Sequence, residues 1–162
     1  MARTSGRNLY GPCALALVTL LLALGALAAR EKPPRPPFRY VAGTENLGQD
    51  CEGNLELGRE GMSFRCPGGA VDIPYASITQ MEYRSDISSK VRKLKVKWRL
   101  RPPYSTSLFG GKRHRFFAVV YSVDEATHVL VLRIRPGLMR PYLAEIDLKA
   151  QRRVEVENLE EY

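Results

Sequence analysis

The sequence predicts a mostly β fold, with seven antiparallel strands in a barrel or sandwich and one C-terminal amphipathic helix that caps it. Two observations carry this prediction. Between Cys51 and Arg135, short apolar or alternating runs recur, and turn-forming residues separate them. After Pro136-Gly137, the apolar residues take the spacing of an amphipathic helix instead of the alternation of a strand.

Residues 1–28 are predicted to be a signal peptide. Arg3 and Arg7 precede an apolar run from Cys13 to Ala29, and this run contains the small-residue cleavage motif Ala26-Leu27-Ala28. An uncleaved membrane anchor is the alternative, because a run of about 17 residues is near the lower limit for crossing a bilayer. We therefore expect an exported protein, periplasmic or extracellular, with N-terminal anchoring as the other possibility.

Residues 29–50 are predicted to be a linker and a loop. The stretch REKPPRPPFRYV at 30–41 holds four prolines, which favour an extended polyproline conformation, and GTENLGQD at 43–50 is polar. The β domain is expected at residues 51–153, and an acidic tail at 154–162 follows it.

The first two strands are predicted as a hairpin that a disulfide closes. The strands are residues 54–57 and 62–65, and Gly58-Arg59-Glu60-Gly61 connects them. Folding the chain at this turn brings Cys51 and Cys66 roughly opposite each other, within reach of a disulfide. An even number of cysteines in the mature part of an exported chain favours such a bridge. Two buried free thiols are the alternative.

The remaining elements follow in order. Strands are predicted at 70–75 and 79–83, and Pro74 restricts the first of them to a sheet edge or a strand end. Residues 92–101 alternate strictly and form the predicted fifth strand, and strands at 115–122 and 127–135 are joined by a tight turn. A helix at 140–153 is expected to cover the sheet through Tyr142, Leu143 and Ile146.

Two motifs give the chain a resemblance to a known family. GNLELGREGMSFRC and VDIPYASITQMEY resemble the opening hairpin and a later strand-turn-strand phrase of pleckstrin-homology-like domains of the GRAM or bacterial type. The resemblance covers residues 51–153 and implies a non-catalytic module that binds phosphoinositides, other lipids or peptides. The basic cluster that phosphoinositide-binding members carry at the first loop is reduced here to Arg59, which lies beside Glu60.

The charge distribution indicates an anionic partner or, alternatively, a soluble surface that happens to be basic. The chain has 25 Lys and Arg against 17 Asp and Glu, and its formal net charge is +8. Four of the acids lie in the last eight residues, so the domain itself is more basic than the whole chain.

The stretch K-L-K-V-K-W-R-L-R at 93–101 concentrates this charge. As a strand, it would turn Leu94, Val96, Trp98 and Leu100 to the core and its cations to the outer face. Neighbouring strands would extend the patch, so the candidate anion-binding residues are Lys93, Lys95, Lys97, Arg99, Arg101, Arg113, Arg115, Arg133 and Arg135. The alternative is a solvated sheet face whose cations pair partly with Glu56, Glu82 or the acidic tail.

The predicted function is that of a non-catalytic, exported binding module. Its partner would be lipid head groups, an acidic polysaccharide or an acidic protein; the alternative is a structural or assembly subunit of a cell-envelope complex. Nucleic acid is not expected, because Trp98 is out of phase with the lysines. The sequence predicts no catalytic residues, no metal site and no cofactor, since His114 and His128 have no ligand-like spacing. We expect His114 to be solvated or, alternatively, pH-sensing, and His128 to be structural.

Overall fold

The domain is built around one eight-stranded sheet. The computed structural model describes residues 37–102 and 114–157. The strands lie in the order β4-β3-β2-β1-β7-β6-β5-β8, and all neighbours are antiparallel except β5 and β8. Their bounds are β1 (Phe38–Gly43), β2 (Glu52–Leu57), β3 (Gly61–Cys66), β4 (Gly69–Pro74), β5 (Ile78–Arg84), β6 (Arg115–Val123), β7 (Ala126–Ile134) and β8 (Glu155–Val156).

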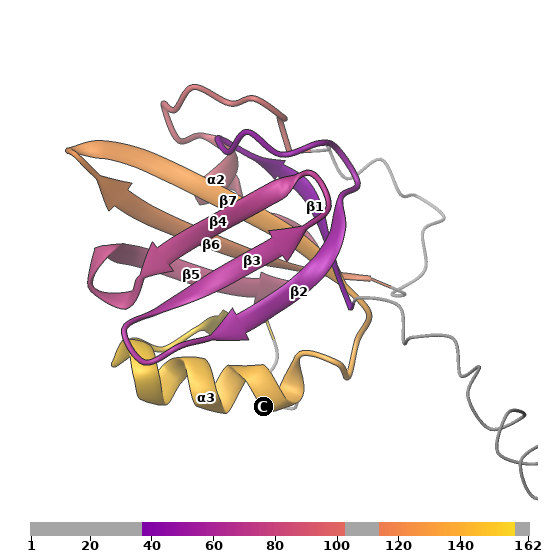
Figure 1. Ribbon diagram of the computed structural model, residues 1–162, viewed down its shortest axis with the longest axis vertical. Helices are drawn as coiled ribbons and strands as arrows, with labels where there is room; N and C mark the ends of the chain where they lie inside the picture. Colours follow the sequence, from indigo (N-terminus) through magenta and orange to yellow (C-terminus); the bar gives the residue numbers. More distant parts are fainter. Residues whose placement is uncertain (1–36, 103–113, 158–162) are drawn as a thin grey trace, which may run out of the picture. The chain divides into compact units, whose positions relative to one another are not determined.

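The sheet bends over a single large core. Figure 1 shows β2, β3 and β4 in a front layer and β5, β6 and β7 behind them, while the short 3₁₀ helix η1 (Tyr75–Ser77) joins β4 to β5. No pairing joins β4 to β5 among the described residues, so the sheet is open and, of the predicted barrel or sandwich, the barrel is not seen. The inner surfaces of both layers contribute to one cluster of buried side chains, which includes Phe38, Tyr40, Phe64, Phe117 and Leu132.

Helix α3 (Arg140–Ala150) lies along the lower side of this core (Figure 1). Leu143 and Ile146 are fully buried in it, and the Tyr142 ring meets the Phe38 ring edge-on at a centroid distance of 5.1 Å. The helix face that contains Tyr142, Leu143 and Ile146 is therefore the face that packs against the core. The helix ends at Ala150, before Gln151 with its φ of 48°, and the chain continues into β8.

The disulfide between Cys51 and Cys66 is present, with the two Cα atoms 5.9 Å apart. Its cause is the hairpin that the sequence predicts: β2 and β3 pair from Asn54 opposite Arg65 to Leu57 opposite Met62. This register places the residues before β2 beside the end of β3. The bridge closes a loop of 15 residues, for which the chain-entropy account gives about 3 kcal/mol of stabilisation.

Two of the sequence predictions are wrong about strands. Residues 92–101 are not a strand: a short helix, α2 (Ser89–Arg92), comes first, and an irregular segment with one isolated bridge, Gly43 to Leu100, follows. Part of the predicted proline-rich linker, in contrast, is strand β1, which pairs with both β2 and β7. The prolines obscured it, but Phe38 and Tyr40 after them alternate with half-buried residues and are fully buried.

The predicted acidic tail also has structure at its start. Residues 155–156 form β8, which runs parallel to β5 at the sheet edge. The side chain of Glu157 accepts hydrogen bonds from Ser85 and pairs with Arg115. The start of the acidic tail is held in place because the Glu157 carboxylate binds the side chain of Arg115 and both the N–H and the hydroxyl of Ser85.

Candidate functional site

The basic segment, residues 93–101, lies across the outer face of the sheet. Leu94, Val96 and Trp98 are half-buried against a second apolar cluster, which Ala42, Ile87, Val91, Ala118, Val120, Val129 and Val131 form. The five cations between them, Lys93, Lys95, Lys97, Arg99 and Arg101, are exposed. Exposure therefore alternates along the segment as the sequence predicts, although the segment contacts the sheet with its side chains and is not one of its strands.

Gly43, at the end of β1, anchors the C-terminal part of the basic segment. Its N–H donates to the Leu100 carbonyl at 2.9 Å, and its carbonyl accepts from the N–H groups of Arg99 and Leu100 at 3.0 and 3.1 Å. Glycine is required there: φ is 151°, and a Cβ would lie 2.3 Å from the Val129 carbonyl oxygen. Because β7 approaches so closely, only glycine fits at position 43. The hydrogen bonds of Gly43 then hold the C-terminal part of the basic segment at this place.

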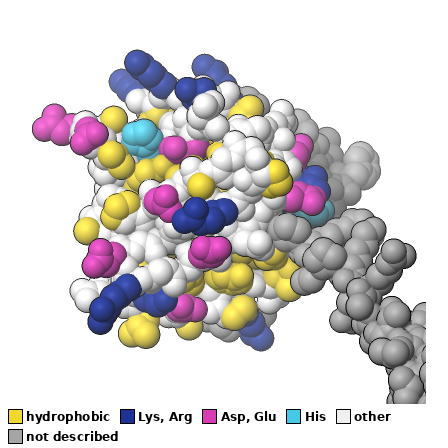
Figure 2. Space-filling model, viewed as in Figure 1, with side chains coloured by type: hydrophobic (Ala, Val, Ile, Leu, Met, Phe, Trp, Pro, Cys, Tyr) yellow, Lys and Arg dark blue, Asp and Glu magenta, His cyan; other side chains and the backbone are white. Residues whose placement is uncertain are grey.

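The cations of the basic segment differ from most others in having no acidic partner. Among the described residues, no ion pair reaches Lys93, Lys95, Lys97 or Arg101, and Arg99 donates to the Asn46 side chain at 2.7 Å. Ion pairs hold many of the remaining cations, namely Arg39, Arg65, Lys90, Arg92, Arg115, Arg133 and Lys149. In Figure 2, Lys and Arg side chains gather at the top of the molecule, where the segment runs.

The other candidate cations are predicted to extend this row from neighbouring strands of the same sheet face. The structure does not arrange them in that way. Arg115 is in register with Ile134 and shares the inner face with Phe117, and Glu157 pairs with it at 3.1 Å. Arg133 lies on the outer face and pairs with Asp50 at 3.4 Å, while Arg135 follows β7 and is exposed. Arg113 lies outside the described residues. The premise of a patch across three paired strands is not met, because the basic segment is not a strand.

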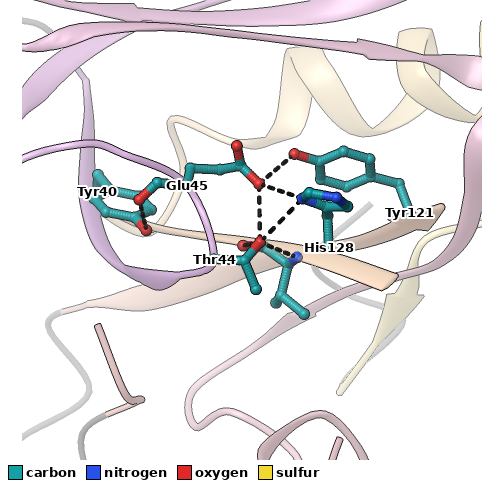
Figure 3. Close-up of polar contacts among 6 residues, drawn as sticks. Tyr40, Thr44, Glu45, Tyr121 and His128 are labelled. Carbon is teal, nitrogen blue, oxygen red and sulfur yellow. Dashed lines mark hydrogen bonds and ion pairs between the residues drawn. The ribbon is translucent and has the colours of Figure 1, made fainter. Parts of the chain in front are cut away.

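A polar cluster lies where the basic segment ends, at the start of β7. Figure 3 shows the Glu45 carboxylate at its centre: Oε1 accepts from the Tyr121 hydroxyl at 2.7 Å and from the Thr44 hydroxyl at 2.9 Å, and His128 Nδ1 lies 3.1 Å from it. Thr44 Oγ1 also accepts from the Val129 N–H at 3.0 Å. The loop after β1 is thereby fixed to the β6–β7 hairpin.

Two tyrosines of this cluster remain protonated well above neutral pH. Burial, followed by the charge of the Glu45 carboxylate, raises the pKa of Tyr40 to about 12. The pKa of Tyr121 is raised further, by burial first and then by its hydrogen bond to Glu45. Both hydroxyls therefore act as donors, Tyr121 to the Glu45 carboxylate and Tyr40 to the Glu45 backbone carbonyl at 3.3 Å.

A cleft of about 720 Å³ separates the basic segment from the tip of the β6–β7 hairpin. Lys95, Lys97 and Arg99 line one side, and residues 125–128 line the other. The hairpin is tight because Asp124 and Glu125 both have positive φ, 48° and 63°, as a two-residue type I′ turn requires. A smaller hollow of about 250 Å³ lies beside Leu94 and Arg101, and Val96 and Trp98 line both spaces.

Sequence reasoning found the cations but missed the polar cluster. His128, for which a structural role is expected, lies with Nδ1 3.1 Å from Glu45, and its ring stacks on Tyr121 at a centroid distance of 5.3 Å. That stacking follows from the tight hairpin, which sets Tyr121 opposite His128. No sequence pattern identifies Glu45 as a partner of this pair, because it is one polar residue in a polar loop. His114 is exposed.

Within residues 37–102 and 114–157, no group of His, Cys, Asp and Glu side chains could hold a metal ion. In the same part of the chain, no helix combines the length and apolar character needed to span a bilayer; the predicted leader lies outside it. The sequence matches no family model and no curated protein.

Proposed function

We propose that the domain is a non-catalytic binding module that contacts an anionic surface through the basic segment. The observation that carries this proposal is the row of exposed cations without acidic partners, set against a domain in which many other cations are paired. A segment that packs with one side and keeps unpaired charge on the other suits recognition of a charged surface.

The fold and the compartment belong to the same proposal. We infer a pleckstrin-homology-like domain, and the support for it is the succession of antiparallel strands β1 to β7 followed by a helix that packs on the inner face. The eighth strand and the open sheet are departures from that plan. The disulfide is compatible with export, which would place the basic segment before phospholipid head groups, acidic polysaccharides or acidic proteins of the cell envelope.

The test is charge reversal on the basic segment. Lys95→Glu with Lys97→Glu is expected to weaken sedimentation with phosphatidylglycerol vesicles by about 30-fold or more, because each basic residue near an anionic surface contributes about 1 kcal/mol. The free energy of unfolding should change by less than about 0.5 kcal/mol, since both lysines are exposed. The loss should shrink at high salt, where screening already weakens the attraction.

Arg59→Glu with Arg152→Glu is the matched control, because it makes the same change in net charge at exposed positions away from the segment. Heparin in place of vesicles tests the polysaccharide. If the segment variant binds both surfaces as well as the parent does, the row of cations is only a solvated face. In that case the assembly-subunit alternative, tested by pull-down of envelope proteins, takes precedence.

A further inference from the structure

We propose that the cleft between the basic segment and the β6–β7 hairpin binds an amphiphilic anion, in which a phosphate or carboxylate is joined to a short apolar chain. The proposal deepens the proposed function and rests on it in one respect, because the same segment supplies the cations. It adds a concave site for an individual ligand. The cleft volume of about 720 Å³ is within the range of about 300–1,000 Å³ that small-molecule sites occupy.

The charge of the cleft selects an anion. Lys95, Lys97 and Arg99 line it, and Glu125, which is exposed at the hairpin tip, is the one carboxylate among its described lining residues. Neither lysine has a carboxylate partner in the described part of the chain, and Arg99 bonds to the neutral Asn46 side chain. An incoming acid group would therefore gain cationic partners without breaking an ion pair.

The floor of the cleft selects an apolar group beside the acid. Val96 and Trp98 line it and are only half-buried, although they pack against the outer face of the sheet. Both residues also line the hollow on the other side of the segment, which gives the apolar surface a continuation past Leu94. An apolar chain placed on this surface would remove water from side chains that the fold leaves partly exposed.

Thr44 and His128 give the far side of the cleft fixed polar groups. Glu45 and Thr44 engage His128 Nδ1, which leaves Nε2 without a partner among the described residues. Because Nδ1 is already engaged, Nε2 is the ring nitrogen left to contact an acid group bound in the cleft that His128 lines. Since Glu45 is held by Tyr121 as well, the ring is positioned before any ligand arrives.

The test uses Trp98, which is the one tryptophan of the chain and lines the cleft. Its fluorescence is followed while the purified chain is titrated with octyl phosphate, with octyl glucoside and with inorganic phosphate, all below micellar concentrations. We expect octyl phosphate to give a saturable change at a concentration about tenfold or more below that of either control compound, since only it offers both the charge and the chain.

Lys95→Gln with Lys97→Gln should weaken octyl phosphate binding by about tenfold or more, and His128→Gln should weaken it while Lys95, Lys97 and Arg99 remain in place. Arg59→Gln with Arg152→Gln is the matched control and should leave it unchanged. Octyl phosphate that binds no better than octyl glucoside, or binding that the two lysine changes do not affect, would overturn the inference.

Vesicles of phosphatidic acid in phosphatidylcholine, compared with phosphatidylcholine alone, separate the two sources of this ligand chemistry. If octyl phosphate binds and the vesicles do not, the ligand is a soluble amphiphile, and the surface contact of the proposed function is wrong. If the vesicles bind through the basic segment and octyl phosphate fails to saturate, the surface contact stands and the cleft is not a site.

Discussion

The two faces of the sheet are covered in different ways. The other half of the sheet and helix α3 cover the inner face, where large side chains such as Phe117, Leu132 and Phe64 are fully buried. Ile87, Val91 of α2 and the irregular basic segment cover the outer face, where the sheet presents small side chains such as Ala118 and Val131. The apolar side chains of the basic segment, Leu94, Val96 and Trp98, are left half-buried.

The difference teaches where a binding surface can arise in such a domain. In the described part of the chain, the inner face is filled by its own large, fully buried residues. On the outer face, a cover one chain wide excludes water from the small residues beneath it and leaves a hollow on each side. Lys95, Lys97 and Arg99 line one hollow and Arg101 lines the other, so the incompletely covered face is also the charged one.

The largest expected effect tests the comparison on one strand. Phe117 is fully buried on the inner face, and its neighbour Phe116 is half-buried on the outer face. Phe117→Ala should lower the free energy of unfolding by about 3–5 kcal/mol. Phe116→Ala should lower it by about 1–2 kcal/mol, because less apolar surface is removed from water there. Urea denaturation of the two variants measures both values.

Trp98→Ala should resemble the Phe116 change for the same reason. A tryptophan in a central strand would cost about 3–5 kcal/mol on truncation, whereas this one is partly exposed. Equal losses for Phe116 and Phe117 would show that the outer face is packed as tightly as the inner one, and the comparison would fail.

An effect smaller than that of Phe117→Ala is expected at Gly43, the last residue of β1. Gly43→Ala places a Cβ against the Val129 carbonyl and forces a side chain onto a φ of 151°. We expect a loss of about 1–3 kcal/mol, together with a red shift of Trp98 emission as the anchored end of the basic segment loosens. Gly48→Ala is the control, because its Cβ would have open space and should change neither measurement. Destabilisation without any change in Trp98 emission would separate the segment from this anchor.

Much of the inner core could be predicted from the sequence, because local rules determine it. The β2–β3 hairpin follows from two alternating runs around a glycine-rich turn, and the disulfide follows from the hairpin. The β6–β7 pair follows from two long apolar runs and a tight turn. Leu143 and Ile146 pack as their helical spacing predicts. In the two hairpins, neighbours in sequence are partners in space.

The outer cover could not be predicted in this way. A segment that lies on a sheet face has one apolar side and one polar side, which is also the pattern of a strand with one buried face. Residues 93–101 therefore alternate as a strand does, and only the contacts of Gly43 and the outer cluster distinguish the two cases. The polar cluster around Glu45 depends on residues from the loop after β1, from β6 and from β7, which come together only after folding.

The smallest expected effect concerns Ser85, just before the residues that cover the outer face of the sheet, and the pH dependence of the free energy of unfolding. Ser85, which follows β5 and precedes α2, donates its hydroxyl and its N–H to Glu157 at 2.6 and 3.0 Å. These hydrogen bonds, and after them the charges of Arg115 and Arg84, lower the pKa of Glu157 from its ordinary value near 4.5. A carboxyl group whose pKa is lower in the folded state stabilises that state when ionised, and this stabilisation is lost as the pH falls through the folded-state pKa.

Glu157→Gln should therefore lower the free energy of unfolding at neutral pH by a small amount, because the site is partly exposed. The difference from the parent should shrink as the pH falls below about 4.5 and vanish once Glu157 is protonated in both states. Denaturation at a series of pH values measures it, with Glu60→Gln, at an exposed turn position, as the control. The loss in the free energy of unfolding caused by Phe117→Ala should not follow the titration of Glu157, since Phe117 stabilises the inner face through apolar burial. A constant difference between Glu157→Gln and the parent at all pH values would mean that the carboxylate charge does not hold the outer cover.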